Sequence, residues 1–139
     1  DLCYEKSSIE EIRLHHVFEH FSRPIALSLI ASWNSWLQSG GILRIEVPDF
    51  KKTAKIIISP ISSKKEKKKS IRHLFGSHEA CWAYHLEGYT HESLCEIFTL
   101  FGFSINKSLK NSWNGTYNIE IIGNKIKDIS INDAEIIGK

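Results

Sequence analysis

The chain lacks the features that would tie it to a membrane, to the cell exterior or to nucleic acid. No apolar run among its 139 residues approaches the roughly 20 needed to span a bilayer, and no signal peptide opens it. The three cysteines (Cys3, Cys81 and Cys95) are an odd number without CxxC spacing, which favours a reducing, cytoplasmic setting over a disulfide framework. A net charge of +2 is too small to indicate nucleic acid as a partner.

Two further absences concern whether the chain is a whole protein or a piece of one. Methionine is missing altogether, including at position 1, so we expect the chain to be an excerpt or a processed piece. No Gly-rich phosphate or nucleotide loop precedes residues 12–50, which are otherwise typical of one βαβ unit. A His/Glu cluster lies where the first strand of that unit ends. Ligands bind outside the carboxyl ends of strands in open α/β sheets, so this cluster is the first candidate site.

Apolar periodicity predicts the remaining elements. Pro24 suits the first turn of a helix, Gly40-Gly41 suits its stop, and Asn114-Gly115 is a strong hairpin signal. Residues 50–61 are ambiguous between helix and strand, and the lysine-rich residues 62–70 are expected to form a charged surface loop. Residues 71–89 are expected to be irregular. The predicted strands are 11–17, 42–47, 103–111 and 117–123, and the predicted helices are 23–38 and 90–101.

Four segments, in order along the chain, resemble class I S-adenosylmethionine-dependent methyltransferases, particularly the methyltransferase type 11-like group. Residues 2–12 look like that family's LPFxDxSxDxI segment, and residues 16–20 (HVFEH) look like its SHVLEH segment after the fourth strand. Residues 40–49 (GGILRIEVPD) look like its PGG-strand-PD segment. Residues 88–103, from GYT to FGF, look like GFTxxxLxxLLxxxGF. The chain therefore resembles the C-terminal half of these enzymes.

The resemblance implies an α/β fold. We expect a partial Rossmann-like sheet of strands four to seven with a C-terminal antiparallel hairpin, in a domain of residues 1–124 followed by a tail or linker, 125–139. It implies S-adenosylmethionine as the cofactor of the complete domain. This piece alone should bind it weakly or not at all, because the family's Gly-rich loop precedes the matched residues. The implied partners are a methyl acceptor and either a missing N-terminal half or another protein that covers strand four.

The resemblance also assigns candidate residues. Asp1, Leu2, His15 and His16 would border the adenine side of the cofactor. The acceptor side would be formed by His20, Asp49 and His85. Histidine suits proton transfer because its ordinary pKa, about 6.5, is close to working pH. A carboxylate directly after a strand could orient an acceptor hydroxyl. No metal ion is expected.

Three alternatives remain open from the residues themselves. The pattern His16-x-x-Glu19-His20 also matches the H-x-x-E-H signature of inverted zinc peptidases, which would need it inside a long helix. The lysine run at 64–69 could attract phosphate groups or RNA, although no RNA-binding signature accompanies it. A non-catalytic, methyltransferase-like remnant or interaction domain that no longer binds cofactor would carry the same fold signals.

Overall fold

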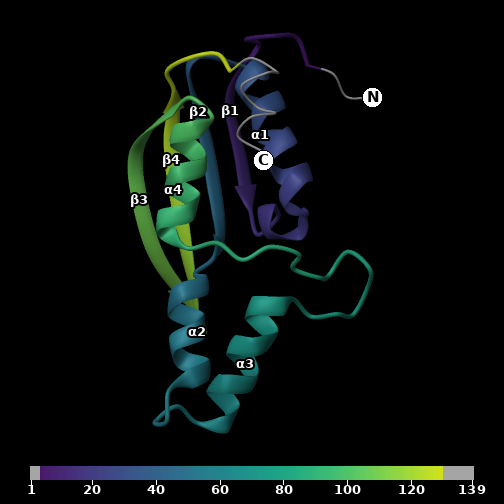
Figure 1. Cartoon of the computed structure of the whole chain (residues 1–139), viewed down its shortest axis with the longest axis vertical. Coiled ribbons are helices and arrows are strands. Elements are labelled where there is room, and N and C mark those ends of the chain that lie inside the picture. Colours follow the sequence, from purple (N-terminus) through teal and green to yellow (C-terminus); the bar gives the residue numbers. More distant parts are fainter. Residues whose placement is uncertain (1–3, 130–139) are drawn as a thin grey trace.

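Four strands form one mixed sheet in the order β1-β2-β4-β3. Strands β1 (Ile9–His15) and β2 (Leu37–Pro48) run parallel. Strand β4 (Thr116–Lys125) lies between β2 and β3 (Phe103–Trp113) and is antiparallel to both (Figure 1). The predicted sheet with its terminal antiparallel hairpin is therefore confirmed, and β4 is an inner strand of the sheet.

The computed structural model describes residues 4–129. The predicted cofactor residues Asp1 and Leu2 lie outside the described residues, as does most of the predicted tail. No described helix is long and apolar enough to cross a membrane.

The predicted helix at 23–38 is α1 (Arg23–Trp36), with Pro24 in its first turn. It ends at Trp36, and β2 begins at the next residue. Gly40 and Gly41 lie inside β2, so the prediction that they stop the helix is wrong. The helix ends earlier because Leu37 already has extended backbone and pairs with Ile9 of β1.

The predicted charged loop at 62–70 is also wrong, because these residues begin helix α3 (Lys64–Phe75). The Ser63 side chain accepts a hydrogen bond from the Glu66 backbone N–H, and the Glu66 carboxylate accepts one from Ser63 N–H. This capping box offsets the low apolar content of the lysine run. The ambiguous residues before it form helix α2 (Phe50–Ile58), and α2 and α3 pack side by side beyond the carboxyl end of β2 (Figure 1).

One face of the sheet carries the core. Helices α1 and α4 (His91–Leu100) pack on it through Ile30, Trp33, Leu94 and Phe98. The opposite face is polar: Arg44 of β2 makes ion pairs at 3.3 Å with Glu11 and at 3.6 Å with Glu120. The core residues of the strands are Leu14, Leu37, Leu43, Ile45, Val47, Phe103, Ile119 and Ile121.

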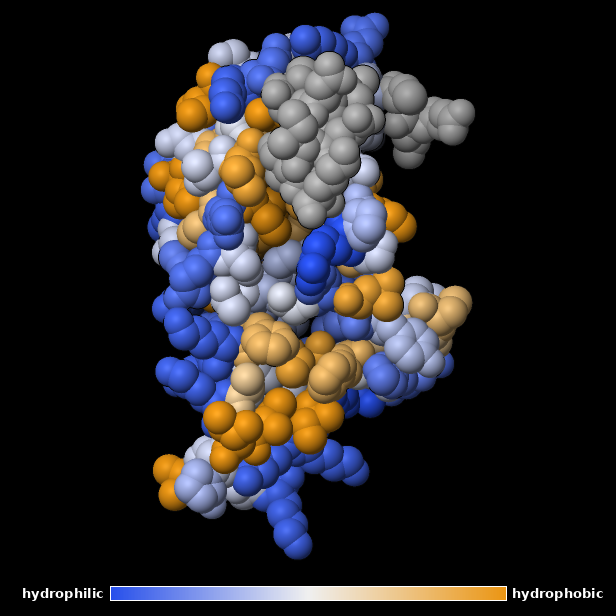
Figure 2. Space-filling view, viewed as in Figure 1, coloured by the Kyte–Doolittle hydropathy of each residue, from blue (hydrophilic) through white to orange (hydrophobic). Residues whose placement is uncertain are grey.

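Apolar side chains are exposed on the α2–α3 pair and on the segment that follows it. Figure 2 shows apolar atoms gathered at the end of the molecule where Figure 1 places these helices. The exposed residues include Ile58, Ile61, Ile71, Phe75, Trp82 and Leu86. Some of this surface belongs to residues 71–89. The prediction that these residues are irregular is wrong for residues 71–75, because they form the last part of helix α3.

Candidate functional site

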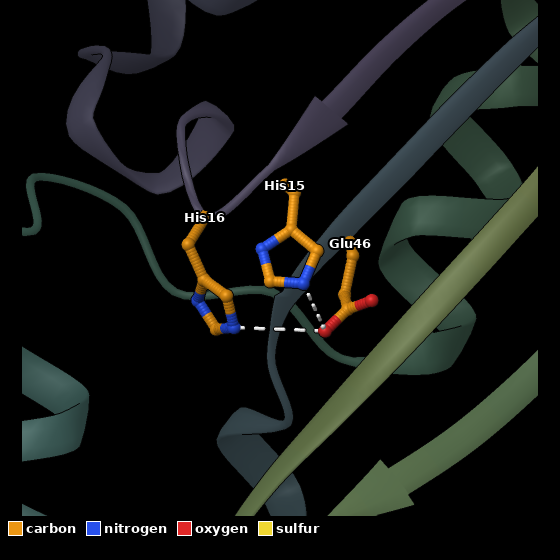
Figure 3. Close-up of side chains that lie close together, drawn as sticks. All are labelled: His15, His16 and Glu46. Atoms are coloured by element: carbon orange, nitrogen blue, oxygen red, sulfur yellow. Dashed lines mark ion pairs between the residues drawn. The ribbon is translucent and has the colours of Figure 1, made fainter. Parts of the chain in front are cut away.

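His15, His16 and Glu46 meet where β1 ends beside β2 (Figure 3). Strand register causes this, because His15 pairs with Glu46 in the parallel ladder. The Nε2 atoms of His15 and His16 lie 3.3 and 3.6 Å from Glu46 Oε1, and Asn118 Nδ2 donates to the same oxygen at 3.2 Å. The predicted pair His15 and His16 is thus brought together with a nearly buried carboxylate.

A sharp turn after β1 carries the second half of the cluster. His16 has a left-handed backbone (φ 53°), and the short helix η1 (Phe18–His20) follows at once. Phe18 is fully buried and draws the turn onto the core, which places the neighbouring Glu19 carboxylate inside the protein, 1% exposed. The His16 Nδ1 atom donates to Glu19 Oε1 at 3.0 Å. Glu19 therefore lies between the His15/His16 group and a second pair of histidines, His20 and His85.

His20 and His85 lie beside each other on the other side of Glu19. Their rings meet edge to face with centroids 4.7 Å apart, and His85 Nε2 is 3.9 Å from Glu19 Oε1. The segment that carries His85 is held by Leu86 N–H, which donates to the Glu19 carbonyl at 2.8 Å. Two residues predicted for the acceptor side, 65 positions apart, are thus neighbours.

Three histidines, His16, His73 and His85, have pKa values shifted in opposite directions. The hydrogen bond to Glu19 raises the pKa of His16 against the lowering effect of burial, and the charge of Glu46 adds to the rise. Burial lowers the pKa of His85 and that of His73, whose ring lies 6.0 Å from the His16 ring. Near neutral pH the cluster therefore favours a proton on His16 and neutral rings at His73 and His85.

The shift at His16 predicts a pH-dependent stability. Its folded pKa is raised, so its contribution is fully present below the unfolded value of about 6.5 and is lost as pH rises through the folded pKa. We expect His16→Asn to lower the free energy of unfolding by about 1.5–3 kcal/mol near pH 6, as for a hydrogen bond to a charged group. The loss should shrink as the pH rises through the raised folded pKa. Urea unfolding near pH 6 and at alkaline pH measures it.

His78→Asn is the matched control, because His78 also has a left-handed backbone (φ 59°) and bonds the Phe75 carbonyl through Nε2. Asparagine tolerates this backbone region, so neither substitution adds strain. The control should show the same small change at both pH values. An equal loss for His16→Asn across the range would contradict the assigned ion pair with Glu19 and Glu46.

The predicted candidate Asp49 caps a helix in the structure. Its Oδ1 accepts from the Lys52 backbone N–H at 2.9 Å at the start of α2. Its own backbone N–H donates to the Tyr117 carbonyl. The structure brings His20 and His85 together but adds no contact between them and Asp49. The acceptor role of Asp49 stays a prediction.

Two residues of the cluster were missed by sequence reasoning. Glu46 lies in a strand segment, GILRIEVP, that is apolar apart from Glu46 and Arg44, and a carboxylate in such a segment was an available signal. His73 had none, because it follows the lysine run that was taken for a loop. Its Nε2 lies 3.2 Å from the Tyr117 carbonyl oxygen, which requires helix α3 to pack against β4.

The zinc-peptidase interpretation fails on local structure. His16 lies in a bend and Glu19 and His20 lie in a three-residue helix, so the H-x-x-E-H residues do not share a long helix. His16 and Glu19 bond each other directly. The H-x-x-E-H residues therefore form the turn that follows β1.

Comparison with solved structures identifies the fold. A SAM-dependent methyltransferase of Methanosarcina mazei matches 91% of this chain with 63% of its own, at a TM-score of 0.63 and 16% identity. The 1,6-didemethyltoxoflavin-N1-methyltransferase of Burkholderia thailandensis, solved with S-adenosylhomocysteine, covers 88% of this chain with 46% of its own, at a TM-score of 0.62 and 13% identity. The fold is that of a class I methyltransferase.

The class I methyltransferase likeness extends to magnesium protoporphyrin IX methyltransferase of Synechocystis PCC 6803, at a TM-score of 0.57 and 17% identity over 90% of this chain. The chain spans between 46% and 63% of the length of these three structures. No family model and no curated protein sequence matches it. The predicted resemblance to part of a class I methyltransferase sheet is confirmed for the fold.

Proposed function

We propose that this chain is the C-terminal portion of a SAM-dependent methyltransferase that transfers a methyl group to an acceptor bound beside His20 and His85. One observation carries the proposal: on a class I methyltransferase sheet, the His/Glu cluster occupies the carboxyl end of β1 and β2. This is the edge where ligands bind in α/β sheets. The solved neighbours that carry S-adenosylhomocysteine support the choice of cofactor.

The residues present fit one border of such a cofactor site. His15 ends β1 with its side chain 58% exposed, so its ring is available to a ligand. His16 lies deeper and is bound to Glu19 and Glu46, which makes it a positioning residue for the turn. S-adenosylmethionine supplies an activated methyl group on a sulfonium. The Gly-rich part of the site would come from elsewhere, as the partial coverage of the neighbours suggests.

The acceptor side follows from the protonation of the cluster. An O–H or N–H acceptor must lose a proton, and a neutral ring takes it up more readily than a charged one. Burial lowers the pKa of His85, which keeps the ring neutral near pH 7. His20 lies against it, and the exposed apolar side chains of Trp82 and Leu86 lie on the same segment of the chain. We assign His85 the role of proton acceptor.

Calorimetric titration with S-adenosylhomocysteine tests the proposal. The protein titrated should be the natural polypeptide, including any residues that precede Asp1. We expect saturable binding that His15→Ala weakens and His78→Ala leaves unchanged, because His78 lies on the segment after α3 and bonds the Phe75 carbonyl. The 139-residue chain by itself should bind weakly or not at all. A natural polypeptide without any binding heat would contradict the enzyme and favour the non-catalytic remnant.

A further inference from the structure

Glu19, His20 and His85 form a compact group of metal-ligand atoms. A carboxylate oxygen of Glu19 and one ring nitrogen from each histidine lie within 4.8 Å of one another. Around a zinc ion with bonds of about 2.1 Å, tetrahedral ligand atoms are about 3.4 Å apart. The 3.9 Å between His85 Nε2 and Glu19 Oε1 is about half an ångström longer than that. The widest spacing in the group, at most 4.8 Å, is up to about 1.4 Å longer than that, so a closure of this size by the side chains would bring the group to coordination distance.

The Glu19 carboxylate is only half satisfied. Its Oε1 accepts from His16 Nδ1, whereas its Oε2 is buried and receives no hydrogen bond within residues 4–129. The side chain is 1% exposed, so water does not compensate from outside. An unpaired oxygen of a buried carboxylate is costly unless a cation or a donor meets it.

Neither His20 nor His85 donates a hydrogen bond to Glu19 Oε2. The His20 Nδ1 atom bonds the Tyr84 carbonyl at 2.9 Å, and the His85 Nδ1 atom bonds the Leu74 carbonyl at 3.2 Å. A carbonyl only accepts, so both Nδ1 atoms carry the ring proton and both neutral rings keep their lone pair on Nε2. The His85 Nε2 atom that keeps its lone pair lies 3.9 Å from Oε1 of the same carboxylate whose Oε2 is unpaired. Metal-binding histidines commonly have their second nitrogen fixed in this manner.

The adjacent group of His15, His16 and Glu46 differs in this respect. Glu46 Oε1 already faces Asn118 Nδ2 and the Nε2 atoms of both histidines. These three contacts satisfy this carboxylate oxygen without a metal. Of the two groups, only Glu19 with His20 and His85 leaves a buried carboxylate oxygen unpaired.

We propose that Glu19, His20 and His85 bind a divalent first-row transition-metal ion, with Zn²⁺ as the probe. Two imidazoles and one carboxylate suit zinc and leave a further coordination position open. The ion would join the turn after β1 to the segment that precedes α4. The inference does not depend on methyl transfer. A bound ion would occupy the His85 lone pair, so the metal titration described next decides whether His85 is a ligand or a free proton acceptor.

The test is calorimetric titration of Zn²⁺ into the metal-stripped 139-residue chain. We expect one saturable site and a rise in Tm on adding Zn²⁺, because a ligand that binds the folded state stabilises it. His85→Ala and His20→Ala should each weaken binding by about 100-fold or more, since even second-shell changes cost about 10–100-fold. Visible absorption of the Co²⁺-loaded chain should be lost in both variants.

Glu19→Gln keeps the fold testable, because the amide has the same shape and removes the cost of a buried charge. It should abolish the Zn²⁺-induced rise in Tm while far-UV circular dichroism stays unchanged. His15→Ala and His78→Ala are the controls and should bind Zn²⁺ as the parent chain does. Absence of saturable binding by the parent, or loss of binding in His15→Ala but not in His85→Ala, would overturn the assignment.

Discussion

Replacing Phe18 by alanine should lower the free energy of unfolding by about 3–5 kcal/mol, as for other buried aromatic side chains. Phe18 is fully buried, stacks on Tyr89 with ring centroids 5.0 Å apart and lies 6.0 Å from the Trp33 ring. It joins the turn after β1 to α1 and to the segment before α4. Its loss leaves a cavity that three separate elements would have to close. Urea unfolding followed by tryptophan fluorescence measures the change.

The neighbouring Val17→Ala is the control, because Val17 is 43% exposed and contributes little buried area. Its effect should stay within about 0.5 kcal/mol, as for other surface positions. The Phe18 variant should also lose the raised pKa of His16, since Glu19 is held in place by the burial of Phe18. Proton NMR titration of the histidine ring follows this. A Phe18→Ala protein as stable as Val17→Ala would contradict the core assigned here.

The second large effect is expected at Gly76, the residue after α3. Its φ of 85° and ψ of 178° lie in a region that is essentially restricted to glycine. A Cβ atom there would lie 2.1 Å from the Ala83 carbonyl oxygen, which is backbone and cannot swing aside. We expect Gly76→Ala to cost about 2–6 kcal/mol, from backbone strain of about 1–3 and overpacking of about 1–3 kcal/mol. The same change should displace His85, whose backbone N–H bonds the Phe75 carbonyl.

Gly40→Ala separates backbone strain from the clash. Gly40 has a similar φ of 78°, but a Cβ atom there would meet nothing within 4 Å. It should cost only about 1–2 kcal/mol, the penalty for a left-handed alanine. Chemical denaturation of both variants gives the comparison. Equal losses would show that the close approach of Gly76 to the Ala83 carbonyl does not hold the segment in solution.

Local chemistry predicted the elements that depend on neighbours in sequence. Thr90 caps α4 by accepting from the Ser93 N–H, and Asn114 and Gly115 take the left-handed backbone that a two-residue hairpin requires. Ser63 and Glu66 carry the same kind of signal, because their spacing allows the capping box that begins α3. At this helix start the capping residues are a better guide than the lysine-rich composition, which favours a loop.

The candidate site was predictable only in part. His15, His16 and His20 were found because they follow a strand, and their positions depend on the β1 end and the turn after it. Asp49 was found by the same rule, but its carboxylate is held by the Lys52 N–H. The unpaired Oε2 of Glu19 has no sequence signature, because burial depends on what packs over the turn.

Periodicity, turn residues and short motifs were enough to predict the βαβ unit, the closing hairpin and the family resemblance. They could not predict which histidines share a carboxylate. Parallel register set Glu46 beside His15, and the return of the chain after α3 set His85 beside His20 and Glu19. Such contacts join residues about 30 to 70 positions apart, and no local spacing encodes them because their geometry is set by long-range packing.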